Sequence, residues 1–558
     1  MSTAAHALAF ASSSGSRVVL LVHGFQGFGG GPEYRCLPEP LAYPAQSSDF
    51  GLLGRQLHER GLVVYVARYT SNAARTERLD ESARCLSEQI LAARRWHDVP
   101  SVTVVAHSMG GIVSRAYVEG PDYRGDVAAL VTLGAPHHGI PGAGRLLTLL
   151  YGLPFGLDCQ AHPGACELFP ERMEAFNARH QPRPDVAYDL VGGTRGWLLS
   201  WLIGGADDGV IGVDSAVGAR MAADGARRWL VHDAHSDFGG TVTDHYLASE
   251  DTLACLAPAL GLDAARGVCR STGARGGGAR RLLGPADVVA DGAPLGSGAA
   301  VPHADGSAGW ALWPGTPVRR ALLPPGAAIA VPVVLDGATA RVVVRWSGAA
   351  PGLALRAPDG ALSDAGNVEL SWPGSRVTGA SWPDPAGGVT VFELAAPRPG
   401  TWFVHAAAGT LTAALAVFAA MDSDIQLAVE VPPAVAPGSV VVLRGRLTAP
   451  REPAPDGLFL TARVGSGATA RGAVTLAAAA DGAVTGGTDG TSWLLALPVR
   501  APQEPGLHLV SLQLGGTLTD GTALEREEQR VLEVVPRGDA LHLPFVAGRS
   551  PGPRHAAR

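Results

Sequence analysis

Short apolar runs alternate with helix-like segments through residues 17–260 of this 558-residue chain. The apolar runs predict strands over 17–22, 62–69, 101–106, 127–133, 186–191 and 227–231. Apolar residues at helical spacing predict helices over 48–60, 77–96, 110–119 and 249–260. Strands as apolar as these are buried on both faces, so their alternation with helices predicts a doubly wound, mostly parallel sheet of the α/β class. We expect this domain to span residues 1–266.

The pattern changes in the second half of the chain. Strand-like runs such as "ARVVVRWSG" and "VVVLRGRLTAP" follow one another there and are separated by turns rich in Pro, Gly and Asp. This pattern predicts two all-β immunoglobulin-like sandwich domains, over 310–421 and 422–536. Residues 267–309 are rich in Gly, Ala and Arg and are typical of a linker. Residues 537–558 are expected to form a tail.

Two apolar stretches fit none of the predicted strands. One is "GRLLTLLYGLPFGL" at 144–157, and the other is "GWLLSWLIGG" at 196–205. The first lies in an interval, about 140–184, that interrupts the alternation of strands and helices. We expect this interval to be a lid region over an apolar cleft. Ordinary core helices are the alternative, and the sequence does not separate the two.

The segment "VVAHSMGGIVSRAYVEG" places Ser108 where a predicted strand turns into a predicted helix. Ala106, Gly110 and Gly111 keep its surroundings small, and the motif is G-x-S-x-G with alanine in the first position. In a nucleophile elbow, small neighbours allow strand and helix to approach closely while the serine Oγ is presented at the tip of the sheet. The start of the following helix then faces a developing negative charge. Ser108 is therefore the predicted nucleophile.

A nucleophilic serine needs an acid and a base, which follow it along the chain in this topology. The predicted acid is Asp208 in "GGADDGVIGVDSA", with Asp207 and Asp214 as competitors. The predicted base is His245, just before the last predicted helix. His235 is the alternate base, because it lies closer to the end of the last predicted strand.

Backbone N–H groups are expected to complete the site as an oxyanion hole. The first predicted strand ends in "LLVHGFQGFGG", so the N–H groups of Phe25 and Met109 are the predicted donors. In "APHHG", His137 and His138 follow the strand 127–133. We expect these histidines to shape the turn, and contact with substrate is the alternative.

The motifs "VHGF", "AHSMGGIVSRAY", "LVTLGAPHHG" and "DDGVIGVDSA" resemble those of bacterial lipases of the α/β-hydrolase fold. The stretch from "HSMGG" to "GAPHHG" also resembles the GPI inositol-deacylase branch of that fold, in which an Asp-His pair before the last helix supplies the base, as Asp244 and His245 would here. The resemblance covers about residues 15–265. It implies a serine lipase or esterase that hydrolyses carboxylic esters of acyl lipids.

This scheme requires no metal and no cofactor. A structural calcium ion would need an acidic cluster, but no loop motif supports one at Asp207, Asp214, Asp237 and Asp244. A transacylase or amidase would use the same triad and is one alternative. A surface-binding protein with a degenerate hydrolase domain is another, and in either case the sandwiches could bind a surface or polymer.

Net charge and cysteine content limit the expected binding partners and the expected cellular location of the protein. A net charge of -7 without a basic stripe argues against nucleic acid. The expected partner is a hydrophobic ester or lipid, with peripheral contact to lipid surfaces. Six cysteines, all at or before residue 269, predict a disulfide-stapled extracellular or cell-surface domain, with Cys159–Cys166 as the best pair. Buried thiols and a cytoplasmic location are the alternative, since the first residues show no signal-peptide pattern.

Overall fold

A computed structural model gives the fold. It describes residues 18–25, 35–43, 50–72, 75–141, 157–196, 203, 206–219, 225–236, 243–262, 267–271, 316–364, 368–369, 376–384, 387–449, 453–465, 469–473, 477–478 and 491–536. Within these ranges no helix is long and apolar enough to cross a membrane.

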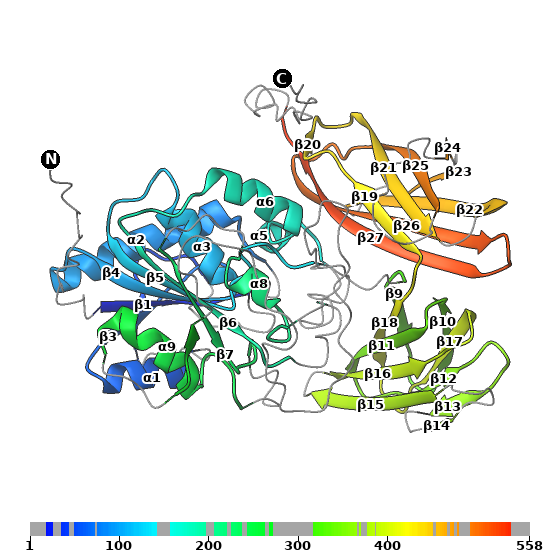
Figure 1. The fold of residues 1–558 in the computed structure, drawn as a ribbon, viewed down its shortest axis with the longest axis horizontal. Helices are drawn as coiled ribbons and strands as arrows, with labels where there is room; N and C mark the ends of the chain where they lie inside the picture. Colours follow the sequence, from blue (N-terminus) through cyan, green and yellow to red (C-terminus); the bar gives the residue numbers. More distant parts are fainter. Residues whose placement is uncertain are drawn as a thin grey trace, which may run out of the picture.

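An eight-stranded sheet occupies the first part of the chain (Figure 1). Its strand order is β2-β3-β1-β4-β5-β6-β7-β8. The strands from β3 to β7 run parallel, and the edge strands β2 and β8 pair antiparallel. The strands are β1 (Val18–Val22), β2 (Leu41–Ala42), β3 (Val63–Val66), β4 (Val102–His107), β5 (Val127–Leu133), β6 (Ala187–Gly193), β7 (Arg227–Val231) and β8 (Arg270–Ser271). The predicted mostly parallel α/β sheet is confirmed.

Helices cover both faces of this sheet (Figure 1). They are α1 (Gly51–Glu59) and α9 (Glu250–Leu260) on one face, and α2 (Leu79–His97) and α3 (Met109–Val118) on the other. Strand β1 is buried throughout, and alternate residues face the two layers. Leu21 belongs to the apolar cluster of α1 and α9, whereas Leu20 belongs to the cluster of α2 and α3. Burying one such side chain stabilises the fold by about 1.5–3 kcal/mol.

The last helix of this layer has defined ends. The Ser249 Oγ accepts a hydrogen bond from the Asp251 N–H at 3.0 Å, which caps the start of α9. Gly261 ends the helix with φ 61°, a left-handed conformation that costs glycine little. Both ends of α9 are therefore defined by local interactions.

Three short helices were not predicted as separate elements. They are α5 (Pro163–Cys166), α6 (Pro170–Arg179) and α8 (Val213–Ala216). The helices α5 and α6 fall in the interval predicted as a lid. Its most apolar part, 142–156, lies outside the described residues, as does most of the stretch 196–205. The lid therefore stays a prediction.

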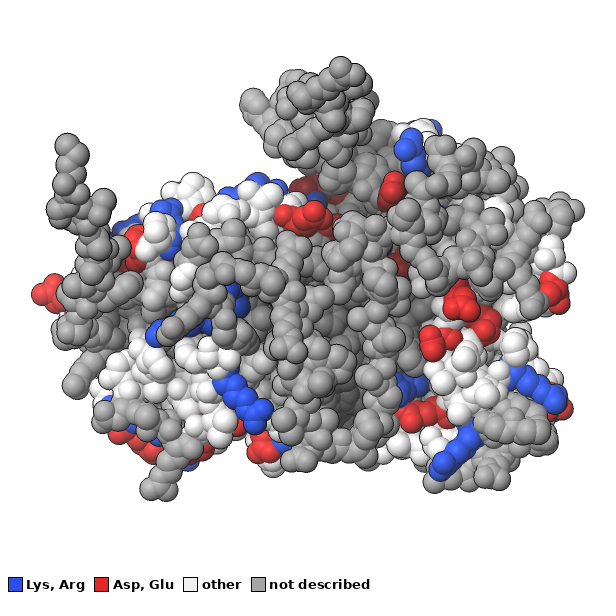
Figure 2. Space-filling model, in the orientation of Figure 1, with Lys and Arg blue, Asp and Glu red and all other residues white. Residues whose placement is uncertain are grey.

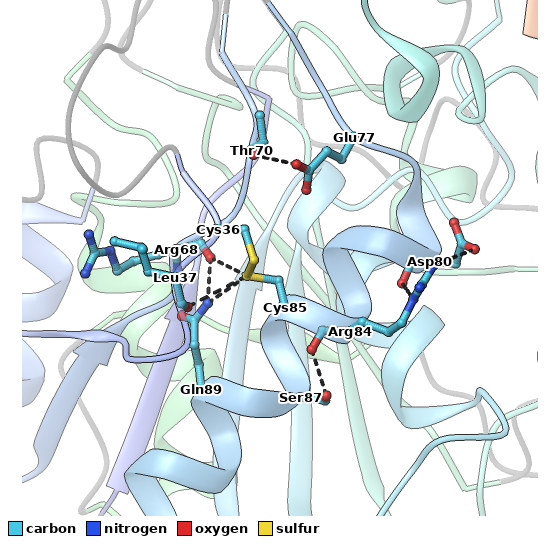
Figure 3. Close-up of a disulfide and its surroundings, with 10 residues drawn as sticks. All are labelled: Cys36, Leu37, Arg68, Thr70, Glu77, Asp80, Arg84, Cys85, Ser87 and Gln89. Atoms are coloured by element: carbon cyan, nitrogen blue, oxygen red, sulfur yellow. Dashed lines mark hydrogen bonds and ion pairs between the residues drawn. A yellow bond between two sulfur atoms is a disulfide. The ribbon is translucent and has the colours of Figure 1, made fainter.

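Disulfides join all six cysteines in pairs. The bonds are Cys36–Cys85, Cys159–Cys166 and Cys255–Cys269. The predicted pairing of Cys159 with Cys166 is confirmed. The first bond ties the segment before β2 to α2 (Figure 3). It closes the longest loop, with a separation of 49 residues, so it restricts the unfolded chain the most.

Two pairs of β-sheets follow in the C-terminal region. Sheets β10-β17-β12-β13 and β14-β15-β16-β11-β18-β9 share one apolar core, and sheets β19-β21-β25-β24 and β20-β27-β26-β22-β23 share another. The strands are β9 (Arg319–Leu323), β10 (Ala328–Leu335), β11 (Thr339–Gly348), β12 (Gly352–Arg356), β13 (Leu362–Asp364), β14 (Val368–Glu369), β15 (Arg376–Asp384), β16 (Gly387–Ala395), β17 (Gly400–Ala407), β18 (Ala413–Asp422), β19 (Gln426–Glu430), β20 (Ala434–Val435), β21 (Val440–Ala449), β22 (Pro453–Val464), β23 (Thr469–Ala473), β24 (Ala477–Ala478), β25 (Thr491–Arg500), β26 (Gly506–Leu518) and β27 (Ala523–Val534). All pairings are antiparallel except β20 with β27. The predicted all-β region is confirmed, while its immunoglobulin-like character and the domain limits at 266, 309 and 421 stay predictions.

The C-terminal sheets pack directly on the first part of the chain through the segment that carries α5 and α6. The Gln160 side-chain amide donates to the Leu507 carbonyl at 2.8 Å. Arg172, on α6, pairs with Glu533, on β27, at 2.7 Å. The two halves of the chain are therefore joined by polar contacts between residues far apart in sequence.

Apolar packing joins the two halves as well. Along β11, Val342 and Val344 face the core of their own sheet pair. Val343, between them, points to the other face and belongs to the same apolar cluster as α2 and α3. Phe418 and Val391 on neighbouring strands also belong to that cluster. The sheet containing β11 is therefore buried on both faces, which a free sandwich in water would not need.

A buried ion pair connects the two C-terminal sheet pairs. Arg526 lies 2.6 Å from Asp336, and their side chains are 1% and 0% exposed. The Arg526 guanidinium also donates to the Ser423 Oγ at 2.7 Å and to the Ile425 carbonyl at 2.9 Å. Its charge is therefore matched by a carboxylate and by neutral acceptors.

Removing the carboxylate should destabilise this region strongly. In Asp336→Ala, Arg526 stays buried without its counter-ion, so we expect a loss of about 3–5 kcal/mol in urea unfolding followed by tryptophan fluorescence. The control is Glu88→Gln, which breaks an exposed pair with Arg124 and should change stability by less than about 1 kcal/mol. Equal effects of the two variants would contradict the importance of the buried pair.

Candidate active site

The site lies where the carboxyl ends of the adjacent strands β1 and β4 meet. The chain passes from β1 to β3 on one side and from β4 to β5 on the other, so the connections after β1 and β4 leave in opposite directions. In open α/β sheets, ligands bind at such a point. Ser108 follows β4 and has φ 54° and ψ -129°. A side-chain-bearing residue adopts this conformation only under strain, and it is the geometry of a nucleophile elbow. The Ser108 N–H is held by the Leu133 carbonyl at 2.9 Å.

Glycines make the close approach of these loops feasible. A Cβ on Gly24 would lie 2.6 Å from the Ser108 Cβ, and a Cβ on Gly110 would overlap the His23 carbonyl oxygen. The turn after β1 and the elbow after β4 are therefore in backbone contact. The small residue predicted at 110 is required by this contact, whereas the similar need at Gly24 was not predicted.

A continuous hydrogen-bonded chain begins at Ser108. The His235 Nε2 lies 2.9 Å from the Ser108 Oγ, and the His235 Nδ1 lies 2.9 Å from the Asp208 Oδ2. All three side chains are buried. Because the carboxylate can only accept, His235 carries its proton on Nδ1 and offers the lone pair of Nε2 to the Ser108 hydroxyl.

The preference for His245 over His235 as the partner of Ser108 is corrected by this geometry. The imidazole that contacts Ser108 belongs to His235, on the loop just after β7. His245 instead pairs through its backbone with Ala234, in a short parallel bridge. The histidine that reaches Ser108 therefore lies four residues after the end of β7.

Asp208 is bound on both of its oxygens. Its Oδ1 accepts hydrogen bonds from the N–H groups of Val210 at 3.0 Å and Ile211 at 2.7 Å. Its Oδ2 faces His235, and its carbonyl accepts from the His235 N–H at 2.8 Å. The acid and the histidine are therefore locked together through main chain and side chain.

The competing acids lie elsewhere. The Asp207 Oδ1 accepts from the Gly209 N–H at 2.6 Å, which shapes the turn after Asp208. Asp214 is in the first turn of α8. Of the three carboxylates considered from the sequence, the structure brings Asp208 to the histidine.

Two residues of the site were missed in the sequence. The Tyr246 hydroxyl donates to the Asp208 Oδ2 at 3.0 Å. Burial, together with the Asp208 charge, raises the pKa of Tyr246 well above its usual value, so it remains a donor. Gly134 has φ 56°, and a Cβ there would lie 2.7 Å from the Asp208 Oδ2. Gly134 and Tyr246 lie beside the histidine-containing segments "LGAPHHG" and Asp244-His245, but no motif marks either of them.

His107 contacts His235 through a hydrogen bond and through its ring. Its Nε2–H donates to the His235 carbonyl at 2.9 Å, and the two rings lie 4.7 Å apart. Burial, and then the neighbouring His235, lower the pKa of His107 well below its usual value. His107 is therefore a neutral donor that fixes the backbone of His235.

His137 is buried within the protein. Its Nε2–H donates to the Thr132 Oγ1 at 3.0 Å, and its Nδ1 accepts from Arg115 at 3.3 Å. Burial, and then the Arg115 charge, lower the pKa of His137 well below its usual value. His137 thus joins the turn after β5 to α3, which is the structural role expected of it.

The predicted oxyanion donors flank the serine. Met109 is the first residue of α3, and Phe25 follows the glycine that contacts Ser108. Both side chains are buried in the same apolar cluster. The Phe25 ring meets His162 edge-on at 5.9 Å, so it also contacts the segment that leads to α5. Their role as donors stays a prediction.

The described residues form neither a surface patch of one charge on the face drawn in Figure 2 nor a cluster of metal ligands. Arginine and acidic side chains are interspersed on the face drawn in Figure 2. Among the described residues, no group of three or more His, Cys, Asp or Glu side chains is arranged to hold a metal ion. Asp237, one of the acidic residues considered for calcium, lies outside those residues.

Residues 70–146, which include the Ser108 elbow, match the family model of the PGAP1-like alpha/beta domain. The chain contains a PGAP1-like α/β-hydrolase domain. The crystal structure of Bacillus licheniformis lipase BlEst2 in its propeptide form is similar at a TM-score of 0.53 and 13% identity, over 93% of this chain and 94% of that chain. The PGAP1-like domain and the lipase likeness confirm the expected relationship to α/β-hydrolases.

Further comparisons are weaker. Staphylococcus hyicus lipase is similar at a TM-score of 0.29 and 14% identity, over 44% of this chain and 96% of that chain. No curated protein matches the sequence. The likeness to BlEst2 shows a shared fold over both the PGAP1-like domain and the C-terminal sheets.

The buried neutral histidines predict a loss of stability on acidification. The unfolded chain takes up protons below about pH 6.5, while His107 and His137 resist protonation in the fold. Each such histidine should therefore cost about 1.4 kcal/mol per pH unit below that point, until the lowered folded pKa is reached. We expect His107→Gln, which keeps an N–H donor, to flatten the pH dependence of urea unfolding between pH 7.5 and 5.5.

The exposed His58 provides the control. His58→Gln should leave the slope of stability against pH as it is in the unmodified protein. If His107→Gln and His58→Gln have the same slope, His107 is not held neutral by the fold.

Proposed function

We propose that this protein is a serine carboxylic-ester hydrolase with Ser108, His235 and Asp208 as its catalytic triad. The observation that carries the proposal is the continuous hydrogen-bonded chain from the Ser108 Oγ through His235 to Asp208. It sits on a strained elbow at the carboxyl ends of adjacent parallel strands. The PGAP1-like domain and the lipase fold support the same reaction class.

The reaction would proceed through an acyl-enzyme. The Ser108 Oγ attacks the ester carbonyl carbon while His235 takes up the hydroxyl proton at Nε2. The tetrahedral oxyanion is held by the N–H groups of Phe25 and Met109. His235 then passes the proton to the leaving alcohol, and water repeats the sequence to release the acid.

Asp208, supported by Tyr246, would stabilise the His235 imidazolium that forms in these steps. The Asp208 carboxylate orients His235 and stabilises its positive charge. Tyr246 and the two N–H donors at Val210 and Ile211 hold that carboxylate in position. The burial of the triad strengthens these electrostatic interactions, because water screens them less.

The proposed substrate is a hydrophobic ester such as an acyl lipid. Phe25 and Met109 belong to an apolar cluster that extends to Ile140 and Leu157, both within the interval predicted as a lid. A transacylase or amidase would use the same acyl-enzyme with another acceptor or leaving group. A binding protein with a degenerate hydrolase domain is disfavoured, because all three triad positions are filled and in contact.

We also propose that the C-terminal sheets limit access to the triad until they are removed or displaced. The similar Bacillus lipase was crystallised in a propeptide form that matches nearly the whole of this chain. Here the sheets contact Gln160 and Arg172 on the segment that also touches Phe25 through His162. Three disulfides support the proposal that the protein is exported.

The triad is tested by hydrolysis of p-nitrophenyl esters from acetate to palmitate. Ser108→Ala and His235→Ala should each lose at least about 1,000-fold in kcat/KM, because the nucleophile or its base is gone. His245→Ala is the matched control and should retain activity within a few-fold. Loss of activity in His245→Ala with an active His235→Ala would contradict the assignment of the base.

The covering role is tested by cutting the chain. A specific protease site inserted between residues 271 and 316 would separate the halves of the folded protein. We expect kcat/KM for a long-chain ester to rise after cleavage in high salt, which screens the Arg172–Glu533 pair. Unchanged activity after the halves separate on a sizing column would contradict the proposal.

A further inference from the structure

We propose that Ser71 and Tyr69 are positioning residues that aim the Phe25 N–H at the oxyanion. The inference rests on the proposed function, in which that N–H is a donor. Both residues lie on the segment after β3 and are fully buried. The Ser71 Oγ donates to the Gly24 carbonyl at 3.2 Å, and the Tyr69 hydroxyl donates to the His23 carbonyl.

The geometry of the peptide bond links Ser71 to the donor. The Gly24 carbonyl and the Phe25 N–H belong to one planar trans peptide, so they point in opposite directions. A hydrogen bond that fixes the carbonyl therefore fixes the direction of the N–H. The Gly24 carbonyl accepts from Ser71 and also from the His23 Nδ1 at 2.9 Å. Donation to the carbonyl polarises the peptide and makes its N–H a stronger donor.

Tyr69 secures the preceding peptide in the same way. Its hydroxyl binds the His23 carbonyl, and its ring stacks on the His23 ring at 4.2 Å and 4°. The same carbonyl abuts Gly110 in the elbow, where a Cβ would overlap it. The turn of His23 and Gly24 is thus held between the elbow on one side and the hydroxyls of Tyr69 and Ser71 on the other.

The segment that carries the two hydroxyls is itself anchored. The Arg68 N–H donates to the Gln89 Oε1 at 2.7 Å, and the Gln89 amide donates back to the Arg68 carbonyl. Gln89 lies on α2, one turn from Cys85 and its disulfide (Figure 3). The Thr70 Oγ1 donates to Glu77 at 2.9 Å. A rigid support of this kind is what a positioned donor requires.

Removing one hydroxyl at a time tests the inference. Tyr69→Phe keeps the ring stacked on His23, and Ser71→Ala removes a single oxygen. With p-nitrophenyl esters we expect kcat to fall about 10- to 100-fold, less than or equal to the loss of a whole oxyanion donor, with KM within about twofold. The pH midpoint of kcat should not move, because His235 and Asp208 are untouched.

A second readout reports on the oxyanion hole itself. A thionoester places sulfur where the carbonyl oxygen would be, and sulfur accepts hydrogen bonds poorly. The rate ratio of the ester to the matching thionoester should therefore fall in Ser71→Ala and Tyr69→Phe, and Ser71→Thr should restore it. Rates are taken per titrated active site, so unfolded protein does not count.

Matched controls remove buried hydroxyls away from the site. Ser87→Ala loses a hydrogen bond to the Arg84 carbonyl, and Tyr117→Phe loses one to Asp126. Both should keep the ratio of the wild type. An unchanged ratio in Ser71→Ala and Tyr69→Phe overturns the inference while the triad stands. If the wild type hydrolyses no ester, or Ser108→Ala is as active as the wild type, the proposed function itself fails and the inference falls with it.

Discussion

The backbone strain at Ser108 is the constraint on which the rest of the site depends. A serine with φ 54° lifts its hydroxyl out of the sheet, but only if both neighbouring loops can approach it. Gly24 and Gly110 provide that room, and the Leu133 carbonyl anchors the serine N–H. The turn after β1, the elbow after β4 and the end of β5 are thereby brought to one point, and the loops from β6 and β7 supply the acid and the histidine to it.

The C-terminal half is coupled to this arrangement and is more than an appended module. Polar contacts at Gln160 and Arg172 hold the last strands against α5 and α6. The same segment reaches Phe25 through His162. Apolar residues on the outer face of the sheet containing β11 extend the core of the first domain. A change in the position of the sheets would therefore displace the segment that contacts Phe25, the predicted oxyanion donor.

Local patterns explain which elements could be predicted from the sequence. The six parallel strands of the first sheet and the helices α1, α2, α3 and α9 were predicted, because hydrophobic periodicity is a property of neighbouring residues. The two-residue edge strands β2 and β8 were not, because they are too short to show a period. The elbow at Ser108 was predicted from its motif, and Asp208 was predicted because the acid follows the serine along the chain in this topology. The choice between His235 and His245 was not, since both follow β7 and only the path of the loop decides. Tyr246 and Gly134 act through contacts with Asp208, more than thirty residues away along the chain, so no local pattern marks them.

The most direct test of the central claim is covalent labelling with a fluorophosphonate that carries a long alkyl chain, followed by peptide mass spectrometry. An activated serine displaces fluoride and keeps the phosphonate, whereas ordinary serines do not react. The account predicts one adduct per chain, on Ser108, that is lost in His235→Ala and kept in His245→Ala. Labelling at another serine, or none on Ser108 after the C-terminal half has been cleaved and separated, would contradict it.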